Sequence, residues 1–323
     1  MCTAISYKTY SHYFGRNLDL EYRYNETIAI TPRNFKIEYQ KEKASITGYA
    51  MIGMATVADM YPLYYEAINE HGLGMAALNF PGNAMYHPTK NAYKNIASFE
   101  MIPWVLRQCK TVQQARTVLS NTNVTSSNFN EKLVSTPLHW MLSDKSESIV
   151  VEPLADGLKI YDNPMGVLTN NPPFPFHMQY LNNFINLTNT EPINRFSDKV
   201  QLNAYSRGMG TIGLPGDPSS ASRFVKATFT KLNSVCDCTE SDSVCQFFHI
   251  LGAVEQQKGC VKVNNAFEKT IYTCCCNTDK GIYYYKTYEN NQITAINLFH
   301  EDLDGNMLYT FPLITDQCIR YEN

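Results

Sequence analysis

The second residue of the chain is the feature that most constrains its fold. Cys2 directly follows the initiator Met1, and a small residue at position two permits removal of that methionine. The trimmed chain would begin with a residue that carries both a thiol nucleophile and a free α-amine able to accept its proton. A cysteine placed here by chance would instead be a small buried apolar residue. The catalytic interpretation therefore depends on the groups that the fold places beside Cys2.

Composition places the chain among globular proteins and excludes two classes of partner. Its 323 residues are 44% hydrophobic and 18% charged, enough for a large core. A net charge of -3 gives no basic footprint for nucleic acid, and no cluster of Lys and Arg marks a membrane surface site. Lys8 and His12 interrupt the region where a signal peptide would be apolar, and no run approaches the roughly 18 apolar residues of a membrane span. We therefore expect a cytoplasmic protein.

The ten cysteines do not read as a disulfide scaffold. The consecutive residues 274–276 cannot all pair locally, and a secreted scaffold would be shorter, with evenly spaced cysteines. Reduced thiols in a cytosolic protein fit better. A metal site could be imagined at Cys236, Cys238, Cys245 and Cys260 with His249, but this spacing matches no zinc pattern in which two close pairs converge. We expect no metal.

No repeat, low-complexity tract or Pro/Gly/Ser-rich linker divides the chain, which predicts a single domain over residues 1–323. The segment 69–72 predicts a hairpin. Aromatic and β-branched runs bounded by turn residues predict strands at 13–20, 27–32, 48–57, 64–68, 73–80, 138–142, 148–153, 158–161, 167–169, 270–275, 281–287 and 292–298.

Helical patterns cluster between the two groups of strands. Thr111 and Gln114 form a capping-box pattern before the helix predicted at 112–119. Asp217 followed by Pro218 predicts another helix that starts with Asp217 as its N-cap. Further helices are predicted at 99–108, 176–184 and 243–254. Strands at both ends with helices between them predict an α+β fold in which sheets stack under helix layers.

Arg16 and Asp19 lie three residues apart and follow soon after Cys2. If Cys2 opens one strand and Arg16 lies on its neighbour, the guanidinium can sit beside the thiol and favour the nucleophilic thiolate. Asp19 could then hold the α-amine. Without Cys2, the same pair would read as a surface salt bridge of little energetic value.

Three further polar residues become informative only in combination. Asn79 and Asn170 each end a predicted strand, where asparagine commonly serves turns but could also donate to a developing oxyanion. Arg223 lies in the helix predicted after Asp217 and points away from its apolar stripe, so by itself it would read as a solvated arginine. That stripe, which is expected to face the core, consists of Val225, Phe229 and Leu232.

The order and spacing of eight short segments closely resemble the choloylglycine hydrolase family, specifically its bile salt hydrolases, with penicillin V acylases as the nearest relatives. The resemblance covers nearly the whole chain and weakens only after about residue 308. The segments are MCT at 1–3, FGRNLD at 14–19, NEHGL at 69–73, LNFP at 78–81, LHW at 138–140, GVLTN at 166–170, GLPGD at 213–217 and SRF at 222–224.

This resemblance implies a four-layer αββα N-terminal-nucleophile hydrolase sandwich, with two antiparallel sheets between helix layers. It implies that Cys2 is the nucleophile, that its α-amine is the base, and that Arg16, Asp19 and Arg223 orient and polarise them. Asn170 would supply a side-chain donor to the oxyanion hole, and Asn79 mainly its backbone N–H. The family implies no metal or organic cofactor, and it implies a homotetramer.

The implied substrates are bile salts conjugated to glycine or taurine, because bile salt hydrolases resemble this chain at Asn79 whereas penicillin V acylases tend to carry tyrosine. A steroid needs a wide apolar pocket, although ordinary packing explains each candidate about equally well. Ala58 is smaller than the aromatic residue of some relatives. Segments that line the pocket in relatives contribute Leu18, Tyr22, Tyr24, Ala58, Phe129, Leu133 and Leu138.

Three alternatives remain at this point. Two are enzymes that would use the same centre, namely a penicillin V acylase and an acyl-homoserine-lactone acylase. The third is a non-catalytic steroid-binding protein that retains Met1.

Overall fold

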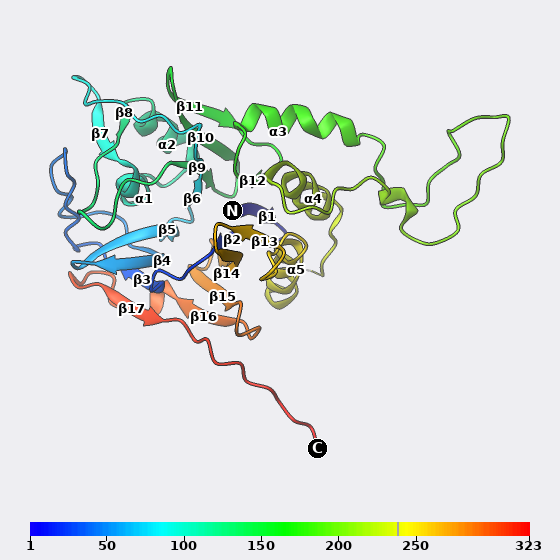
Figure 1. The fold of residues 1–323 in the computed structure, drawn as a ribbon. Helices are drawn as coiled ribbons and strands as arrows, with labels where there is room; N and C mark the ends of the chain where they lie inside the picture. The colour runs from blue at the N-terminus through cyan, green and yellow to red at the C-terminus, as the bar shows by residue number, and fades with distance from the viewer. Residues whose placement is uncertain (238) are drawn as a thin grey trace.

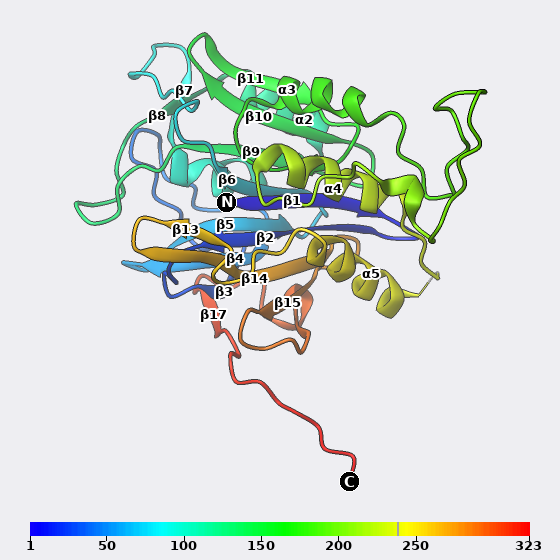
Figure 2. The ribbon, with the colours of Figure 1, turned by 45° about the vertical axis from the view of Figure 1, so that its right-hand side comes forward.

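The computed structural model describes residues 1–237 and 239–323, and its centre consists of two large antiparallel sheets that face each other (Figures 1 and 2). Sheet I contains the N-terminus and has seven strands. In spatial order these are β12 (Val167–Leu168), β1 (Cys2–Lys8), β2 (His12–Leu20), β14 (Ala266–Asn277), β15 (Ile282–Thr287) and β16 (Thr294–Asn297), with β13 (Val261–Val263) paired to β14.

Sheet II has eight strands and packs against sheet I through contacts of β6 with β1 and β2. A separate parallel pair, β7 (Lys94–Ala97) and β8 (Thr122–Thr125), lies beyond it. The order of sheet II is β11 (Gly157–Asp162), β10 (Ser148–Leu154), β9 (Leu138–Ser143), β6 (Gly74–Asn79), β5 (Tyr61–Asn69), β4 (Met51–Ala58), β3 (Thr27–Thr31) and β17 (Tyr309–Pro312).

Helices cover the outer faces of both sheets and complete the four layers (Figure 2). On sheet II, α1 (Met101–Leu106) packs on β5 and β6, and α2 (Val112–Leu119) packs on α1. On sheet I, α4 (Ser220–Asn233) and α5 (Glu240–Gly252) pack over β1, and α3 (Phe174–Tyr180) packs on α4. Single 3₁₀ turns occur at Ser98–Glu100, Leu181–Phe184, Met209–Thr211 and Leu298–His300. The predicted αββα arrangement is confirmed. None of the described helices is long and apolar enough to cross a membrane.

The interior of sheet I explains the unusual cysteine run. Cys274, Cys275 and Cys276 lie on β14 with both faces of the strand covered, and all three are buried and unpaired. They act as small apolar residues. Neighbouring Gly15 on β2 is required by the same crowding, since a Cβ there would lie 2.1 Å from the carbonyl oxygen of Cys274.

Most predicted elements are present with shifted ends. The hairpin at 69–72 joins β5 to β6, and Gly72 supplies the left-handed residue of its turn with φ of +85°. The capping box before α2 is half correct. Thr111 accepts a hydrogen bond from the Gln114 N–H, but the Gln114 side chain accepts from the N–H of Lys110 rather than that of Thr111.

The prediction for the start of α4 is wrong. The helix begins at Ser220, two residues later than expected, because the Asp217 carboxylate binds the Ser219 N–H and the Ser222 hydroxyl and so forms a turn before the helix. The predicted stripe is also wrong at its end, since Leu232 is 60% exposed, whereas Arg223 is buried.

Several short strands were missed by the sequence analysis, namely β7, β8, β13 and β17. They have three or four residues each, which is too short for a two-residue alternation to stand out. Of the candidate metal ligands, Cys238 lies outside the described residues, and Cys245 and Cys260 are exposed cysteines without a disulfide.

Candidate active site

Cys2 opens β1 in the middle of the molecule, and the strand pairs with β2 on one side and β12 on the other. The register places Cys2 opposite Leu18 and Ala4 opposite Arg16. The side chain is 2% exposed. Figure 1 shows the N-terminus between the layers rather than at the edge of the molecule. The expected placement of Cys2 and Arg16 on neighbouring strands is confirmed.

Arg16 is completely buried, and backbone oxygens hold most of its guanidinium. Its Nη1 donates to the carbonyls of Ala77 and Tyr65, and its Nε donates to the carbonyl of Asn17 at 3.3 Å. Nη2 has no hydrogen-bond partner among the described residues. Burial alone would lower the pKa of Arg16, but the negative charges of Cys2 and its other neighbours raise it above the ordinary value. One nitrogen of a permanent cation is therefore left unengaged beside the thiol.

Asp19 lies near the end of β2, three residues after Arg16, and is also completely buried. Its Oδ1 accepts a 2.6 Å hydrogen bond from the Thr270 hydroxyl, while Oδ2 has no partner among the described residues. Burial raises the pKa of Asp19, and the positive charges of Arg223 and the chain's amino terminus oppose that rise. The free oxygen of Asp19 is thus suited to a nearby ammonium group.

The start of the chain occupies this region. The Met1 ammonium donates to the Asp19 carbonyl at 2.9 Å and pairs with Glu268, and the Asp19 N–H donates to the Met1 carbonyl at 3.0 Å. Met1 therefore extends the pairing of β1 with β2 by one residue beyond Cys2.

Asn170 and Arg223 form a continuous link to the backbone of Cys2. Asn170 Oδ1 accepts hydrogen bonds from the Cys2 N–H at 2.8 Å and from Arg223 Nη2 at 2.7 Å. Arg223 Nη1 donates to the Cys2 carbonyl and, at 2.7 Å, to the Thr3 hydroxyl, while its Nε donates to the Pro218 carbonyl. Burial lowers the pKa of Arg223, and the charges of Asp19 and Cys2 counteract this. Unlike Arg16, Arg223 uses all its nitrogens to hold the protein.

Asn79 ends β6, and its backbone faces the cluster formed by Cys2, Arg16, Asp19, Asn170 and Arg223. Its carbonyl accepts a 2.8 Å hydrogen bond from Asn170 Nδ2. Phe80 donates its N–H to the Pro137 carbonyl, so Phe80 is bonded to the chain at the start of β9. In an antiparallel pair the bonded and non-bonded residues alternate, so the N–H and C=O of Asn79 both point away from β9. The N–H and C=O of Asn79 therefore point to the side on which Asn170 lies. The structure brings together all six predicted catalytic residues.

The predicted substrate-pocket residues are more scattered. Leu18 and Leu138 adjoin the cluster, since they pair in register with Cys2 and Asn79. Phe129 packs against the rings of Tyr61 and Phe99, with centroids 5.5 and 5.4 Å away, and its N–H binds the Leu133 carbonyl. Ala58 is the last residue of β4, and Tyr22 and Tyr24 lie between β2 and β3 with exposures of 62% and 48%.

Sequence reasoning missed the residues that support the cluster. Ser220 accepts the Asn170 N–H, His177 binds the Asn170 carbonyl, and Thr3 binds Arg223. Glu66, on β5, lies 3.8 Å from Arg16 Nε. Glu66 is the one charged residue of β5, and this was the signal that could have drawn attention to it.

His139 has a structural role. It is buried, stacks on Phe80 at 4.2 Å, and bridges Glu152 and the Thr169 carbonyl with two 3.0 Å hydrogen bonds.

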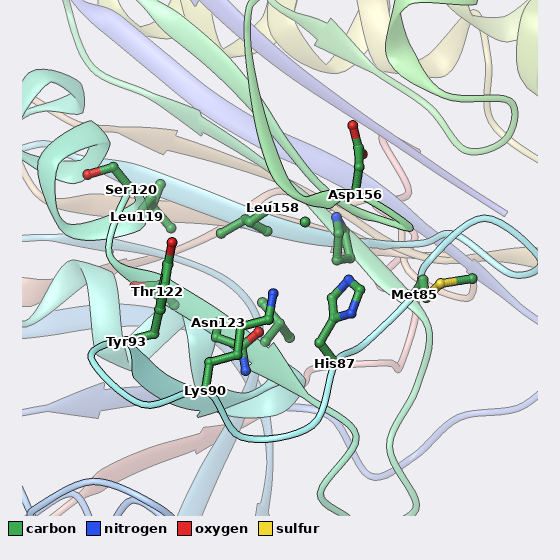
Figure 3. A pocket seen from close by; sticks show the side chains of 13 residues that line it. Met85, His87, Lys90, Tyr93, Leu119, Ser120, Thr122, Asn123, Asp156 and Leu158 are labelled. Atoms are coloured by element: carbon green, nitrogen blue, oxygen red, sulfur yellow. The ribbon is translucent and has the colours of Figure 1, made fainter.

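Two cavities lie away from this cluster. One, of about 640 Å³, surrounds the far end of β1 near Lys8, His12 and Lys231. The other, of about 170 Å³, lies between the segment that carries His87 and Lys90 and the turn at Asp156 (Figure 3). In that cavity His87 Nε2 is hydrogen-bonded to the Leu154 carbonyl. None of the six predicted catalytic residues lines either cavity.

Comparisons with known proteins agree with this geometry. The family of linear amide C–N hydrolases known as the choloylglycine hydrolase family matches residues 2–311. A bile salt hydrolase/transferase of Lactiplantibacillus plantarum is 52% identical over 97% of both chains, and one of Clostridium perfringens is 40% identical over the full length of both.

Solved structures extend the likeness to the fold. A conjugated bile acid hydrolase variant from Clostridium perfringens superposes over the full length of both chains with a TM-score of 0.92 and 38% identity. A penicillin V acylase from Agrobacterium tumefaciens, at 18% identity, shares the fold with a TM-score of 0.76 over 99% of this chain and 94% of its own. With its N-terminal-nucleophile hydrolase fold and its nearly complete match to the family, this chain belongs to the choloylglycine hydrolase family of linear amide C–N hydrolases.

Proposed function

We propose that the chain, acting as a single domain, is a conjugated bile salt hydrolase that cleaves the amide bond between a bile acid and glycine or taurine. The observation that carries the proposal is the buried cluster of Arg16, Asp19, Asn170 and Arg223 around the start of β1, where Cys2 lies. Relatives at 52% and 40% identity that carry the name bile salt hydrolase/transferase support the substrate class.

The first step is removal of Met1, which frees the α-amine of Cys2. In the folded chain the Cys2 nitrogen donates to Asn170 Oδ1 at 2.8 Å, and we assign to Asp19, whose Oδ2 has no partner among the described residues, the role of holding the freed amine as it gains a proton. The amine takes the thiol proton, and the thiolate attacks the amide carbonyl. Arg16 Nη2, which has no other hydrogen-bond partner among the described residues, stabilises the negative charge at this point.

The tetrahedral oxyanion is held by two donors. Asn170 Nδ2 carries two hydrogens and uses one on the Asn79 carbonyl, so the second is available. The Asn79 N–H lies on the same side of its strand as that carbonyl and supplies the other donor. The ammonium of Cys2 then protonates the departing glycine or taurine nitrogen as the C–N bond breaks. Water hydrolyses the remaining thioester and releases the bile acid and the thiol.

A second outcome for the thioester is transfer to an amine. The names of the two relatives include transferase activity. Attack by the nitrogen of a free amino acid instead of water would form a new amide and release the same thiol. We propose this as a side reaction of the same centre, to be detected as new bile acid conjugates when an added amino acid is present.

We assign substrate binding to the seven pocket residues predicted from the sequence, of which Leu18 and Leu138 adjoin the cluster. The others are Tyr22, Tyr24, Ala58, Phe129 and Leu133. Burying the steroid contributes most of the binding free energy, since apolar area yields about 25 cal/mol per Å². Glycine and taurine conjugates should therefore have similar KM values and differ mainly in kcat. A charged residue in place of Leu133 or Tyr24 should raise KM while leaving Cys2 reactive to iodoacetamide.

The test is product analysis with one enzyme preparation on glycocholate, taurocholate, penicillin V and an acyl-homoserine lactone. We expect cholate from both bile salts and a raised KM for penicillin V, whose phenoxyacetyl group buries less surface. A kcat/KM for penicillin V or the lactone above both bile salts would replace the substrate assignment and keep the cysteine mechanism.

The matched variants test the nucleophile itself. Cys2→Ala should be inactive and Cys2→Ser should retain little turnover, because a hydroxyl is a poorer nucleophile near neutral pH. Cys245→Ser, at an exposed cysteine, is the control and should keep full activity. Wild-type rates in Cys2→Ala would refute the cysteine mechanism. An intact mass with Met1 retained in a non-hydrolysing protein would favour the steroid-binding alternative.

We further propose a homotetramer. The chain between α3 and α4 extends far from the sandwich (Figure 1), and several of its large apolar side chains are exposed. Exposed apolar surface is characteristic of protein interfaces. Light scattering coupled to size exclusion should give four times the chain mass. The exposed large hydrophobic residues of this segment are Ile185, Ile193, Phe196, Val200, Leu202, Tyr205 and Ile212.

We also propose a cytoplasmic location. All nine described cysteines are unpaired, and three of them are exposed, which suits a reducing compartment. Cell fractionation tests this, with activity expected in the cytoplasmic fraction and its appearance in the medium contradicting the proposal.

A further inference from the structure

Glu66 is a buried carboxylate that crosses from one sheet to the other. It belongs to β5 of sheet II and is completely buried. Its Oε1 accepts a 2.6 Å hydrogen bond from the Tyr283 hydroxyl, and its Oε2 accepts a 2.7 Å hydrogen bond from the Tyr272 hydroxyl. Both tyrosines are buried residues of sheet I, on β14 and β15. Two donors, one for each oxygen, fix the orientation of this carboxylate.

The fixed carboxylate faces Arg16. Its Oε2 lies 3.8 Å from Arg16 Nε, and no other carboxylate approaches Arg16 within 4 Å among the described residues. The remaining contacts of Arg16 are to neutral backbone carbonyls. Glu66 is therefore the counterion of a fully buried cation that lies beside Cys2.

Charge considerations make this pairing important. Burial raises the pKa of Glu66, whereas Arg16, the two tyrosine hydroxyls and the Cys274 thiol counteract the rise. Removing one partner of a buried pair leaves an uncompensated charge, which then seeks water or another partner. Without Glu66, the guanidinium would lose the only carboxylate within 4 Å of it among the described residues.

We propose that Glu66 is a positioning residue. Together with Tyr272 and Tyr283 it holds the guanidinium of Arg16 close to Cys2, so that Nη2 stays directed at the reacting groups. The inference rests on the proposed role of Arg16 in the amide hydrolysis. Glu66 touches no reacting atom in this scheme and acts only through Arg16.

The test compares Glu66→Gln with Glu70→Gln. Glu70 lies four residues further along the chain and pairs with Arg33 outside the cluster, so its variant reports the cost of breaking an ordinary Arg–Glu pair. Glu66→Gln should lower kcat for glycocholate on the order of 10- to 100-fold with KM changed less than about twofold, since small displacements of a catalytic group cost this much. Glu66→Asp should recover part of the loss, and Glu70→Gln should stay near wild type.

A second readout separates position from charge. The rate of alkylation of Cys2 by iodoacetamide is followed against pH, with the Cys2 peptide quantified by mass spectrometry. If Arg16 stays in place after Glu66→Gln, the thiol feels more positive charge and the midpoint of the alkylation curve moves to lower pH. If Arg16 leaves its position, the midpoint moves to higher pH. We expect the shift to higher pH, and an unchanged or lowered midpoint would overturn the proposal.

The alkylation arm also keeps this inference separate from the substrate assignment. If the wild type hydrolyses no bile salt, the proposed substrate fails, but the midpoint shift still decides the role of Glu66. If Glu66→Gln does not fold, Tyr272→Phe and Tyr283→Phe each remove one hydrogen bond and keep the charge. Each should lower kcat about 3- to 10-fold with a smaller shift in the same direction, and wild-type behaviour of both would overturn the proposal.

Discussion

Two buried arginines flank Cys2 and have different contacts. Arg223 engages the Cys2 carbonyl, the Thr3 hydroxyl, the Asn170 side chain and the Pro218 carbonyl, whereas Arg16 keeps Nη2 unengaged among the described residues. A planar group with several donors in fixed directions is needed to hold several acceptors at once. Arg223 thus shapes the site, and Arg16 is left with capacity to act in it.

Replacing Arg223 by lysine tests this division. Arg223→Lys keeps the charge but loses the fork that joins Cys2 to Asn170, so kcat for glycocholate should fall on the order of 100-fold. Arg116→Lys, at a surface pair with Glu147 and Asp162, is the matched control and should leave kcat unchanged. Steady-state kinetics with thermal melts provides the measurement, and equal kcat in both variants would contradict the role of Arg223.

Blocking the amino terminus tests the base. A chain with an uncleavable residue before Cys2 should fold with an unchanged circular dichroism spectrum and be inactive, because no free α-amine is formed. Intact mass and activity are measured on the same sample. Full activity with the extra residue retained would require another base.

For single residues, the sequence indicated which side chains belong to the site but not whether those side chains are buried. The catalytic interpretation required Cys2 and Arg16 on neighbouring strands, and the register of β1 with β2 places them so. Arg223 by itself read as solvated, yet it is buried, because its guanidinium binds the Cys2 and Pro218 carbonyls, the Thr3 hydroxyl and the Asn170 side chain. Except for Pro218, these partners lie far away in the sequence, so a periodic pattern does not contain them.

Among the elements, the hairpin between β1 and β2 is anchored at its far end by His12. This side chain is buried and contacts Ser6, Ser143 and Thr278, so it joins the two sheets and the β14–β15 turn. Burial lowers the pKa of His12 to about 4, with Lys8 and Lys231 contributing in the same direction and Asp279 and Asp144 opposing. The folded protein therefore keeps this histidine neutral while the unfolded chain protonates it near its ordinary value of 6.5.

This difference predicts acid sensitivity. Because the folded pKa is the lower one, the stabilising contribution is complete above pH 6.5 and is lost as the pH falls towards 4, in total about 3 kcal/mol. His12→Asn should be less stable at pH 7 but should lose less unfolding free energy between pH 6.5 and 4. Urea unfolding at several pH values measures this, and parallel pH dependences in both proteins would contradict it.

Elements were predictable where they were long or marked by turns. The hairpin at 69–72 and the helix at 112–119 carried strong local signals and are present. The strand β17 lies near the end of the chain and pairs with β3, so its stability comes from a partner almost 300 residues away. The sequence around β17 therefore could not predict it.

For the molecule as a whole, we expect the segment between α3 and α4 to contribute to the proposed assembly but not to the stability of the fold. Its large apolar residues are exposed to solvent, so Phe196→Asp with Tyr205→Asp should shift the proposed tetramer to smaller species without lowering the melting temperature. Val235→Asp, at an 86% exposed residue outside this segment, is the control and should remain tetrameric. Light scattering gives the masses, and an intact tetramer in the double variant would contradict the assignment of this surface.

On the proposed mechanism, the position of Met1 in the fold limits when that residue can be removed. In the folded chain its ammonium is paired with Glu268 and hydrogen-bonded to Asp19, and its carbonyl accepts from the next strand. An aminopeptidase acts on an accessible, extended end, so on the proposed mechanism trimming competes with the closure of β1 onto β2. On this mechanism, chains that fold before trimming would retain Met1 and stay inactive although they are correctly folded. Specific activity would then depend on how quickly the nascent chain is trimmed, and overproduction that saturates the aminopeptidase would yield correctly folded protein with a lower fraction of active molecules.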